Sequence, residues 1–343
     1  MTSCDNLVLA SRIPTSIIFI VATSRAHTAA AHAAWIAQTS GTTASLRGTA
    51  TPNSRVAWAT GTKGTVLRTV DAGAHWLPSS VPNSEDLDFR DIEAADATHA
   101  WLLSSGPGDK SRIYRTQDSG KNWQLQLTNP DPTGFFDAIA LFTKRSAILL
   151  GDPVDGRFVI YTTTDGVNWI RRAGPESLPG EGAFAASGTC LIARSNGEAW
   201  FGTGAARVFH SADSGATWTA SQTPLAHQGK AAGVFSLAFH DRLHGIAVGG
   251  DYTKPTERAG NVALTDDGGK TWHEPRTRPN GYRSATAYLS RTEIIATGTS
   301  GTDISHDSGQ TWQSLTPLGY NALAVHKHHL MAVGPEGRIA TGP

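Results

Sequence analysis

The sequence predicts an all-β fold, a seven-bladed β-propeller whose blades are four-stranded and antiparallel. Three observations lead to this prediction. A short phrase of the form Ser/Thr-x-Asp-x-Gly-x-x-Trp occurs five times, and a sixth copy, 163–169, is one residue shorter. The copies recur at roughly 40 to 50 residues, and the tryptophans follow the same period. The aspartates of the six copies are Asp71, Asp118, Asp165, Asp213, Asp267 and Asp307.

Each copy of the phrase predicts a tight turn between two strands. An aspartate accepts hydrogen bonds from backbone N–H groups that follow it, and the glycine adopts a positive φ. The tryptophan then opens the next strand. We expect the six aspartates to be structural, because a turn of this kind assembles no acid–base pair.

Apolar runs around each phrase predict four strands per unit, a to d, with the phrase between strands c and d. In the first unit, strand b covers 56–61 and strand c begins at Gly64. A seventh unit, 320–341, contains neither the phrase nor a strand d. Because 34–40 resembles the segments that follow the other phrases, we expect it to supply that outer strand and to close the ring.

The ten tryptophans occupy two kinds of position in these units. Trp58, Trp101 and Trp200 lie in strand b, and the other seven begin a strand d. Such periodic placement favours packing between blades over stacking on a carbohydrate.

Composition and charge reduce the number of possible classes of function. Only 17% of the residues are charged and the formal net charge is zero, so the basic footprint of a nucleic-acid-binding protein is lacking. No apolar run reaches the length of about eighteen residues that spans a bilayer. We expect no cofactor and no metal site, and the histidine-rich segment 326–329 is interpreted as a polar hairpin tip.

The first 33 residues differ in character from the rest. The apolar core 13–22 and the small residues around Ala31 and Ala33 are typical of a secretory signal peptide. We therefore expect a signal peptide over 1–33, a single propeller over 34–343 and a periplasmic or extracellular location. Cys4 would leave with the signal, so Cys190 would have no disulfide partner and would be a small buried residue.

The repeated phrase is the Asp-box, or BNR repeat, and over 34–343 the chain resembles the photosystem II stability/assembly factor family. The seven units carry this resemblance, together with the phrase 64–73 and two unusual hairpins, 151–157 and 249–258. The resemblance implies a non-enzymatic scaffold that binds another protein, which in the photosynthetic members is a reaction-centre subunit. We expect the partner of this chain to be another envelope protein or a glycan, and the chain itself to be a monomer.

Topology predicts where recognition takes place. In a four-stranded blade, the b–c hairpins and the crossovers to the next blade emerge on the face opposite to the Asp-box turns. Long hairpins of mixed charge on a rigid ring are typical binding elements. The candidate binding residues are Asp109, Asp152, Asp155, Arg157, Glu181, Asp251, Tyr252, Lys254, Glu257 and Arg258.

A glycoside hydrolase, sialidase-like or of another Asp-box type, is the alternative. It would require two carboxylates to face each other at roughly 5 to 10 Å, with one of them held protonated. The carboxylates available for this on the same face are Asp152, Asp155, Glu181, Asp251 and Glu257.

Signal cleavage gives a direct test of export. Protein taken from its native host should begin near Ala34, because the segment before it has the pattern of a cleaved signal. N-terminal sequencing measures this. An intact Met1 or a cytoplasmic location would contradict the prediction.

Overall fold

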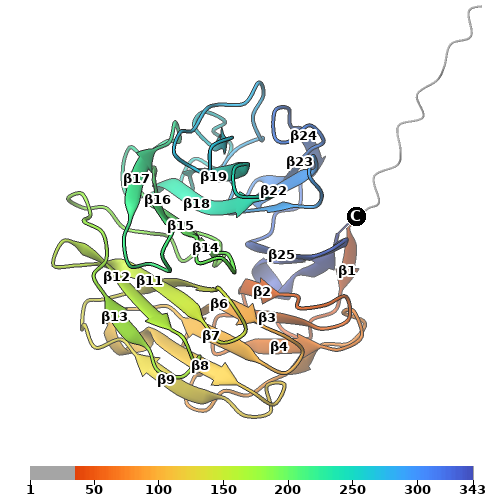
Figure 1. Cartoon of the computed structure of the whole chain (residues 1–343). Helices are drawn as coiled ribbons and strands as arrows, with labels where there is room; N and C mark the ends of the chain where they lie inside the picture. Colours follow the sequence, from red (N-terminus) through yellow and green to blue (C-terminus); the bar gives the residue numbers. More distant parts are fainter. Residues whose placement is uncertain (1–34, 343) are drawn as a thin grey trace, which may run out of the picture. The chain divides into compact units, whose positions relative to one another are not determined.

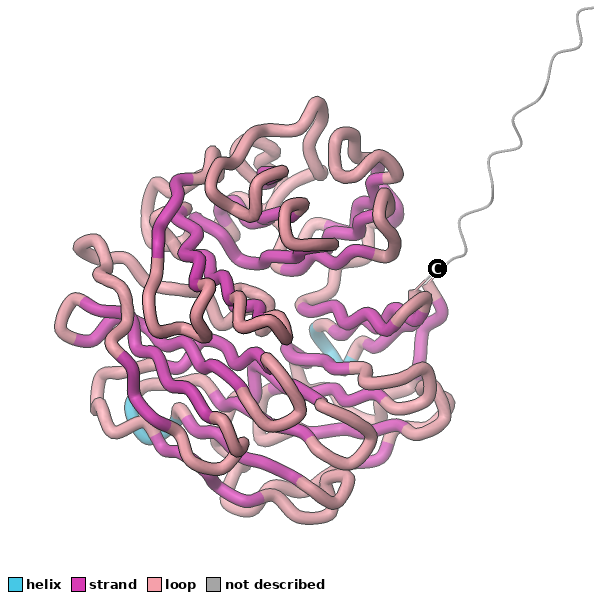
Figure 2. Tube along the Cα trace, in the orientation of Figure 1, coloured by secondary structure: helices cyan, strands magenta, loops and turns pink. Residues whose placement is uncertain are grey.

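Seven antiparallel sheets are arranged around a common centre in the computed structural model, which describes residues 35–342 (Figure 1). The predicted signal peptide lies outside the described residues. Strands and loops make up nearly all of the described chain, and the helical part is limited to the short 3-10 turns η1 (Gly108–Lys110) and η2 (Pro335–Gly337) (Figure 2). The predicted all-β, seven-bladed propeller is confirmed.

The blades follow one another along the chain, and the first strand of each blade is the innermost. Blades 1 and 2 consist of β2 (Leu46–Ala50), β3 (Ala57–Gly61), β4 (Val66–Thr69), β5 (Leu77–Pro78), β6 (Phe89–Ala94), β7 (Ala100–Ser104), β8 (Arg112–Thr116) and β9 (Gln124–Thr128). Blades 3 and 4 consist of β10 (Phe136–Leu141), β11 (Ala147–Val154), β12 (Arg157–Thr163), β13 (Ile170–Arg172), β14 (Leu191–Ala193), β15 (Ala199–Gly202), β16 (Arg207–Ser211) and β17 (Thr219–Gln222).

The remaining strands complete the ring. Blades 5 and 6 consist of β18 (Ala232–Phe239), β19 (Gly245–Asp251), β20 (Val262–Thr265), β21 (Ala285–Tyr288), β22 (Ile294–Gly298), β23 (Gly301–Ser305) and β24 (Gln313–Thr316). Blade 7 consists of β25 (Ala322–His326), β26 (His329–Val333), β27 (Ile339–Thr341) and β1 (Ile36–Gln38).

Blade 5 departs from the four-stranded pattern. Its sheet has three strands, and at the position of strand d only Leu264 and His273 form an isolated bridge. Pro275 follows two residues later, and Pro279 after that. A proline has no N–H to donate to a ladder, so the fourth strand of this blade ends after one pair.

The core lies between the blades. Among the described residues, seven apolar clusters fill the seven contacts between neighbouring blades. The strand-b tryptophans Trp58, Trp101 and Trp200 are fully buried there, as the packing interpretation predicts. Cys190 is also fully buried, and burial raises the pKa of its thiol.

The Asp-box turns are closed by a repeated set of hydrogen bonds. In blade 1, Thr69 Oγ1 donates to Asp71 Oδ1 at 2.7 Å, while the Gly73 N–H donates to Thr69 Oγ1 at 2.9 Å. The N–H of His75 donates to Asp71 Oδ1 at 3.0 Å. This N–H bond, together with the hydrogen bonds from the His75 and Thr69 side chains, holds the pKa of Asp71 below its usual range. The same arrangement recurs around Asp118, Asp165, Asp213, Asp267 and Asp307.

Each box also contacts the preceding blade. Gly120 and Gly166 have positive φ values, and a Cβ atom at either position would lie 2.7 Å from the ring of Trp58 or Trp101, respectively. The indole of Trp101 donates to the Gly166 carbonyl at 3.1 Å. Glycine is therefore required both by the backbone conformation and by the close approach of the neighbouring blade.

Backbone hydrogen bonds separate two faces of the ring. On one face the box turns bond to the a–b loops, as between the Gly268 N–H and the Leu243 carbonyl at 2.9 Å. On the other, the b–c hairpins bond to the crossovers between blades, as between the Tyr252 N–H and the Ala231 carbonyl at 3.1 Å. We call these the box face and the hairpin face.

The N-terminal strand closes the ring. Strand β1 pairs with β27 in the register Ile36↔Thr341, and it forms the outer edge of blade 7. Trp35, just before β1, lies 4.8 Å from Tyr320 between ring centroids. The predicted closure is confirmed.

Removing this strand should open the ring. Deleting residues 35–40 leaves β27 without its outer partner, so we expect a lower melting temperature and association through the exposed edge. Trp35→Ala should lower the free energy of unfolding by about 3 kcal/mol, because it empties an aromatic contact. Calorimetry and light scattering measure both effects. A deletion variant that melts like the wild type and stays monomeric would contradict the proposed role of β1.

Candidate functional site

The candidate residues fall into three groups on the hairpin face. Asp109 lies in η1 of blade 2, where it is exposed and only 3.9 Å from Arg112. Blade 5 carries the largest group in its long b–c hairpin between β19 and β20. Blade 3 and the crossover that follows it carry Asp152, Asp155, Arg157 and Glu181.

The blade 3 hairpin is tied to the crossover by charge. Arg157 contacts Glu176 at 2.6 Å and donates to the Gly174 carbonyl at 3.0 Å. Asp155 occupies the exposed tip with a φ of 53°. Arg157 therefore fixes the start of the crossover, while Asp155 extends towards solvent.

A hollow of about 630 Å³ lies where blades 3 and 4 meet on this face. We call it the blade 3–4 hollow. Its walls come from the end of β11, from the crossover between these blades, from the b–c turn of blade 4 and from the crossover to blade 5. The residues used below that line it are Asp152, Leu178, Glu181, Phe184, Ala205 and Lys230.

Glu181 holds the wall of the hollow in place. Its carboxylate forms an ion pair with Arg207, and Oε1 accepts a hydrogen bond from Arg207 Nε at 2.9 Å. Oε2 accepts from the Leu178 N–H at 2.8 Å, which folds the crossover back on itself. Both carboxylate oxygens are thus committed to the wall.

Asp152 has a different environment. Its Oδ1 accepts a hydrogen bond from the Ala183 N–H at 2.9 Å, and Gly182 passes so close that a Cβ atom there would lie 2.7 Å from Oδ1. Within residues 35–342 no cation forms an ion pair with Asp152. Burial raises the pKa of its carboxyl above the usual range.

A bulge in β10, the innermost strand of blade 3, places a further acidic side chain near Asp152. The pairing of β10 with β11 slips between Phe136 and Ala138, which leaves Asp137 in a bulge. Asp137 is 1% exposed, and its Oδ2 has no hydrogen-bond partner among the described residues. Burial, and then the charge of Asp152, raise the pKa of Asp137 well above the usual range.

A series of aromatic rings connects the hollow with the blade 5 hairpin. Phe184 stacks on Phe235 with centroids 3.7 Å apart, and Phe235 meets Tyr282 edge to face at 4.8 Å. Tyr252, which is 50% exposed, contacts both Phe235 and Tyr282. Phe235 and Tyr282 are buried, so the two groups of candidate residues are joined by packed rings beneath the hairpin face.

The blade 5 hairpin is ordered by its own polar groups. Asp251 Oδ1 accepts hydrogen bonds from the N–H and the hydroxyl of Thr253, and the hydroxyl bond lowers the pKa of Asp251. Glu257 accepts from the Ala259 N–H at 3.1 Å, and Arg258 donates to the Arg278 carbonyl at 2.9 Å. Lys254 lies 3.7 Å from Asp251 with most of its side chain exposed.

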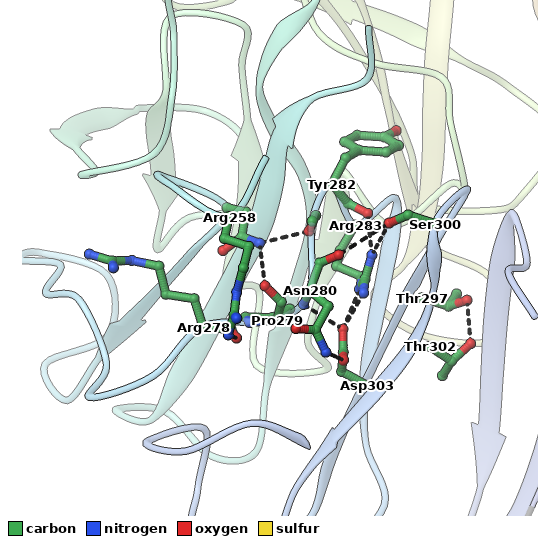
Figure 3. A network of polar contacts seen from close by, with 12 residues as sticks. Arg258, Arg278, Pro279, Asn280, Tyr282, Arg283, Thr297, Ser300, Thr302 and Asp303 are labelled. Atoms are coloured by element: carbon green, nitrogen blue, oxygen red, sulfur yellow. Dashed lines mark hydrogen bonds and ion pairs between the residues drawn. The ribbon is translucent and has the colours of Figure 1, made fainter. Parts of the chain in front are cut away.

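A buried ion pair anchors the neighbouring crossover, as Figure 3 shows. Arg283 and Asp303 pair with side chains that are each 1% exposed, and Asp303 also accepts from the Asn280 N–H at 2.9 Å. Arg283 donates to Ser300 Oγ at 2.9 Å. Arg283 Nη1 also donates to the Tyr282 carbonyl at 2.7 Å, so the buried pair holds the backbone of Tyr282 in place.

Sequence reasoning missed several residues at or beneath the hairpin face. Asp137, Phe184 and Phe235 were not among the candidates, although Phe184 is the aromatic residue of a crossover that the hairpin-face argument had selected. The bulge that turns Asp137 towards Asp152 has no signal in a single sequence. Lys230 lies in the crossover to blade 5, and the sequence analysis did not consider that crossover.

The next question is whether the described residues could hold a metal ion. Over 35–342 no three histidine, cysteine, aspartate or glutamate side chains gather into a group that could hold an ion. His326 and His329 face each other across the β25–β26 hairpin, next to the exposed Lys327 and His328.

Comparison with known proteins agrees with the repeat and the fold. Residues 263–274 match the family model of the BNR/Asp-box repeat. Photosystem II assembly lipoprotein Ycf48 of Synechococcus sp. (strain CC9902) is 23% identical over 290 residues, which cover 73% of this chain and 83% of that protein. Photosystem II stability/assembly factor HCF136, chloroplastic, of Arabidopsis thaliana is 28% identical over 114 residues. That match covers 32% of this chain and only 26% of the plant protein.

A solved structure of YCF48 bound to a D1 peptide has the same fold. It superimposes with a TM-score of 0.65 at 18% identity, covering 90% of this chain and 96% of that one. The chain is thus a seven-bladed Asp-box β-propeller. Its sequence is homologous to the Ycf48 and HCF136 photosystem II assembly factors, as the resemblance in the repeats predicted.

The buried carboxyl of Asp137 should make stability fall as pH rises. In the unfolded state the carboxyl ionises near about pH 4, whereas in the folded state its pKa is higher. Between these two pKa values only the folded state keeps the proton, so the folded state loses stability as pH rises. Asp137→Asn should therefore match the wild type near pH 4 and exceed its stability near neutral pH. Urea unfolding across this range measures the difference, with Asp155→Asn as a control at an exposed position. Parallel curves for Asp137→Asn and the wild type would contradict this account.

Proposed function

We propose that the protein is an exported, non-enzymatic scaffold that binds a partner polypeptide through its hairpin face. The observation that carries this proposal is that the blade 3–4 hollow and the exposed Tyr252 lie on the same face and are joined by packed aromatic rings. This face combines a hollow with an exposed aromatic and mixed charges, and a rigid ring holds its loops in place. Such features are typical of protein recognition sites.

The homologous proteins support binding of a polypeptide. A structure of YCF48 contains a D1 peptide, so a propeller of this fold accommodates a segment of another protein. Asp-box propellers are shared by many proteins, and function has to be argued from the site. We infer a peptide-like segment as partner here because the hollow and the exposed blade 5 hairpin are two separate elements on one face rather than a single closed pocket.

Export is supported by the N-terminal pattern of the sequence and by one relative. The Synechococcus protein is a lipoprotein, which is consistent with a location outside the cytoplasm. Over residues 35–342 the structure contains no helix with the length and apolar character needed to cross a membrane. We propose that this chain acts in the cell envelope.

The glycoside hydrolase alternative has less support from the hairpin face. Glu181 is paired with Arg207, and the pKa of Asp251 is lowered by hydrogen bonds, so neither is suited to hold a proton for a leaving group. Asp152 has a raised pKa, but the carboxyl group next to it, Asp137, is only 1% exposed and is therefore not open to a substrate. A panel of aryl-glycosides tests this alternative directly.

Changing the exposed residues of the blade 5 hairpin should abolish partner capture. In the triple variant Tyr252→Ser, Lys254→Ser, Arg258→Ser, one aromatic and two cations are lost from exposed positions, so stability should stay within about 1 kcal/mol of the wild type. Capture of the partner from the native envelope fraction should fall to background, because exposed aromatics and arginines dominate binding energy. Cross-linking and mass spectrometry measure this.

The chain offers a matched control on the box face. Leu243, Lys121 and Arg145 are exposed there, and changing all three to Ser removes one large apolar group and two cations. This variant should bind like the wild type. If it loses the partner while the hairpin variant keeps it, binding occurs on the box face and the proposal is wrong.

A further inference from the structure

Two neighbouring carboxyl groups lie at the blade 3–4 hollow. Asp152 lines the hollow and Asp137 lies beside it in the β10 bulge. Neither forms an ion pair within the part of the chain that the structure describes, and Asp137 Oδ2 is both buried and without a hydrogen-bond partner. The third acid of the region, Glu181, is satisfied by Arg207. A buried carboxyl group without a hydrogen-bond partner destabilises a fold even when it keeps its proton, so the presence of this pair calls for an explanation.

The fold uses only one oxygen of Asp152. Oδ1 accepts from the Ala183 N–H, and the close passage of Gly182 fixes the carboxylate against the crossover. Oδ2 has no hydrogen-bond partner among residues 35–342, and it is not fully buried in protein. The carboxylate is therefore held rigidly with one oxygen available to the hollow, an arrangement that favours a charge-assisted hydrogen bond to a ligand.

The other walls of the hollow are apolar. Phe184 is held flat against Phe235 by stacking, and Leu178 is 48% exposed on the crossover. Pro153 and Pro179 add to the apolar lining. An aromatic face next to a carboxylate attracts a cation through the ring quadrupole, and apolar walls accept the methylene groups of a long side chain.

We infer that the blade 3–4 hollow binds one lysine or arginine side chain of the partner polypeptide, with its stem between Phe184 and Leu178 and its cationic group at Asp152. This inference rests on the proposed scaffold function and specifies its partner. Lys230 and His227 also line the hollow, so the charge of Asp152 offsets the repulsion by Lys230 for one cation, and a second cation would meet that repulsion without an offset. The site therefore selects a single basic residue in an otherwise mixed segment, rather than a polybasic stretch.

Selection from a displayed library of random peptides tests the inference on the full-length protein. Peptides selected on the wild type should be enriched in segments with one Lys or Arg. Asp152→Asn keeps the hydrogen bond from Ala183 but removes the charge, so it should weaken these peptides roughly tenfold or more. Fluorescence anisotropy with synthetic copies measures the affinity. Binding to the wild type should also weaken with rising salt, and residual binding to the variant should not.

Three further variants distinguish recognition of charge from a structural effect of the substitution. Ala205 lies on the wall contributed by the blade 4 turn, so Ala205→Arg places a positive charge in the hollow without touching Asp152. It should abolish binding of the same peptides, and Ala205→Gln should retain most of it. Asp155→Asn, the same isosteric change at the exposed hairpin tip of blade 3, should have no effect.

The outcomes separate this inference from the scaffold proposal. Peptides without a basic residue, or binding that is unchanged in both Asp152→Asn and Ala205→Arg, would overturn the inference. If those same peptides are lost in the blade 5 hairpin variant, the scaffold proposal stands. If the selection yields no peptide that binds the hairpin face, both are wrong.

Discussion

The structure depends on one repeated contact, in which the glycine of each Asp-box lies against the blade before it. Gly120 on Trp58 and Gly166 on Trp101 leave no room for a side chain, and the positive φ of the box makes glycine the residue that fits. The aspartate closes the turn, so the hydrogen bonds of one blade set the packing of the next. A single local motif thereby determines both the hairpin within a blade and the spacing between blades.

Because this contact lies on the box face, the opposite face is free to vary. The hairpins there differ from a bare turn in blade 1 to the long, charged loop of blade 5, and their backbone bonds run to the crossovers rather than to the core. Polar anchors replace apolar packing in holding these loops. Glu181 with Arg207, and Arg283 with Asp303, fix two crossovers at the edges of the proposed binding surface.

The fold could be predicted from the sequence because its signals are local and periodic. The boxes, the strand-b tryptophans and the segment that pairs as β1 follow one repeating unit. The short outer strand of blade 5 was not predicted, and the prolines after His273 account for it only in retrospect. For the site, the sequence predicted only which face of the ring should carry it. The stacking of Phe184 on Phe235 and the bulge at Asp137 depend on which strands become neighbours, and no local pattern encodes that.

Ring closure by β1 has a consequence for the order of folding. Among the described strands, β1 leaves the ribosome first, and its partner β27 leaves last. Blades 1 to 6 can each form from consecutive strands, whereas blade 7 must wait for both ends of the propeller to meet. Until then the nascent chain carries open sheet edges, so closure is a slow, long-range step during which the unfinished ring is most exposed to aggregation.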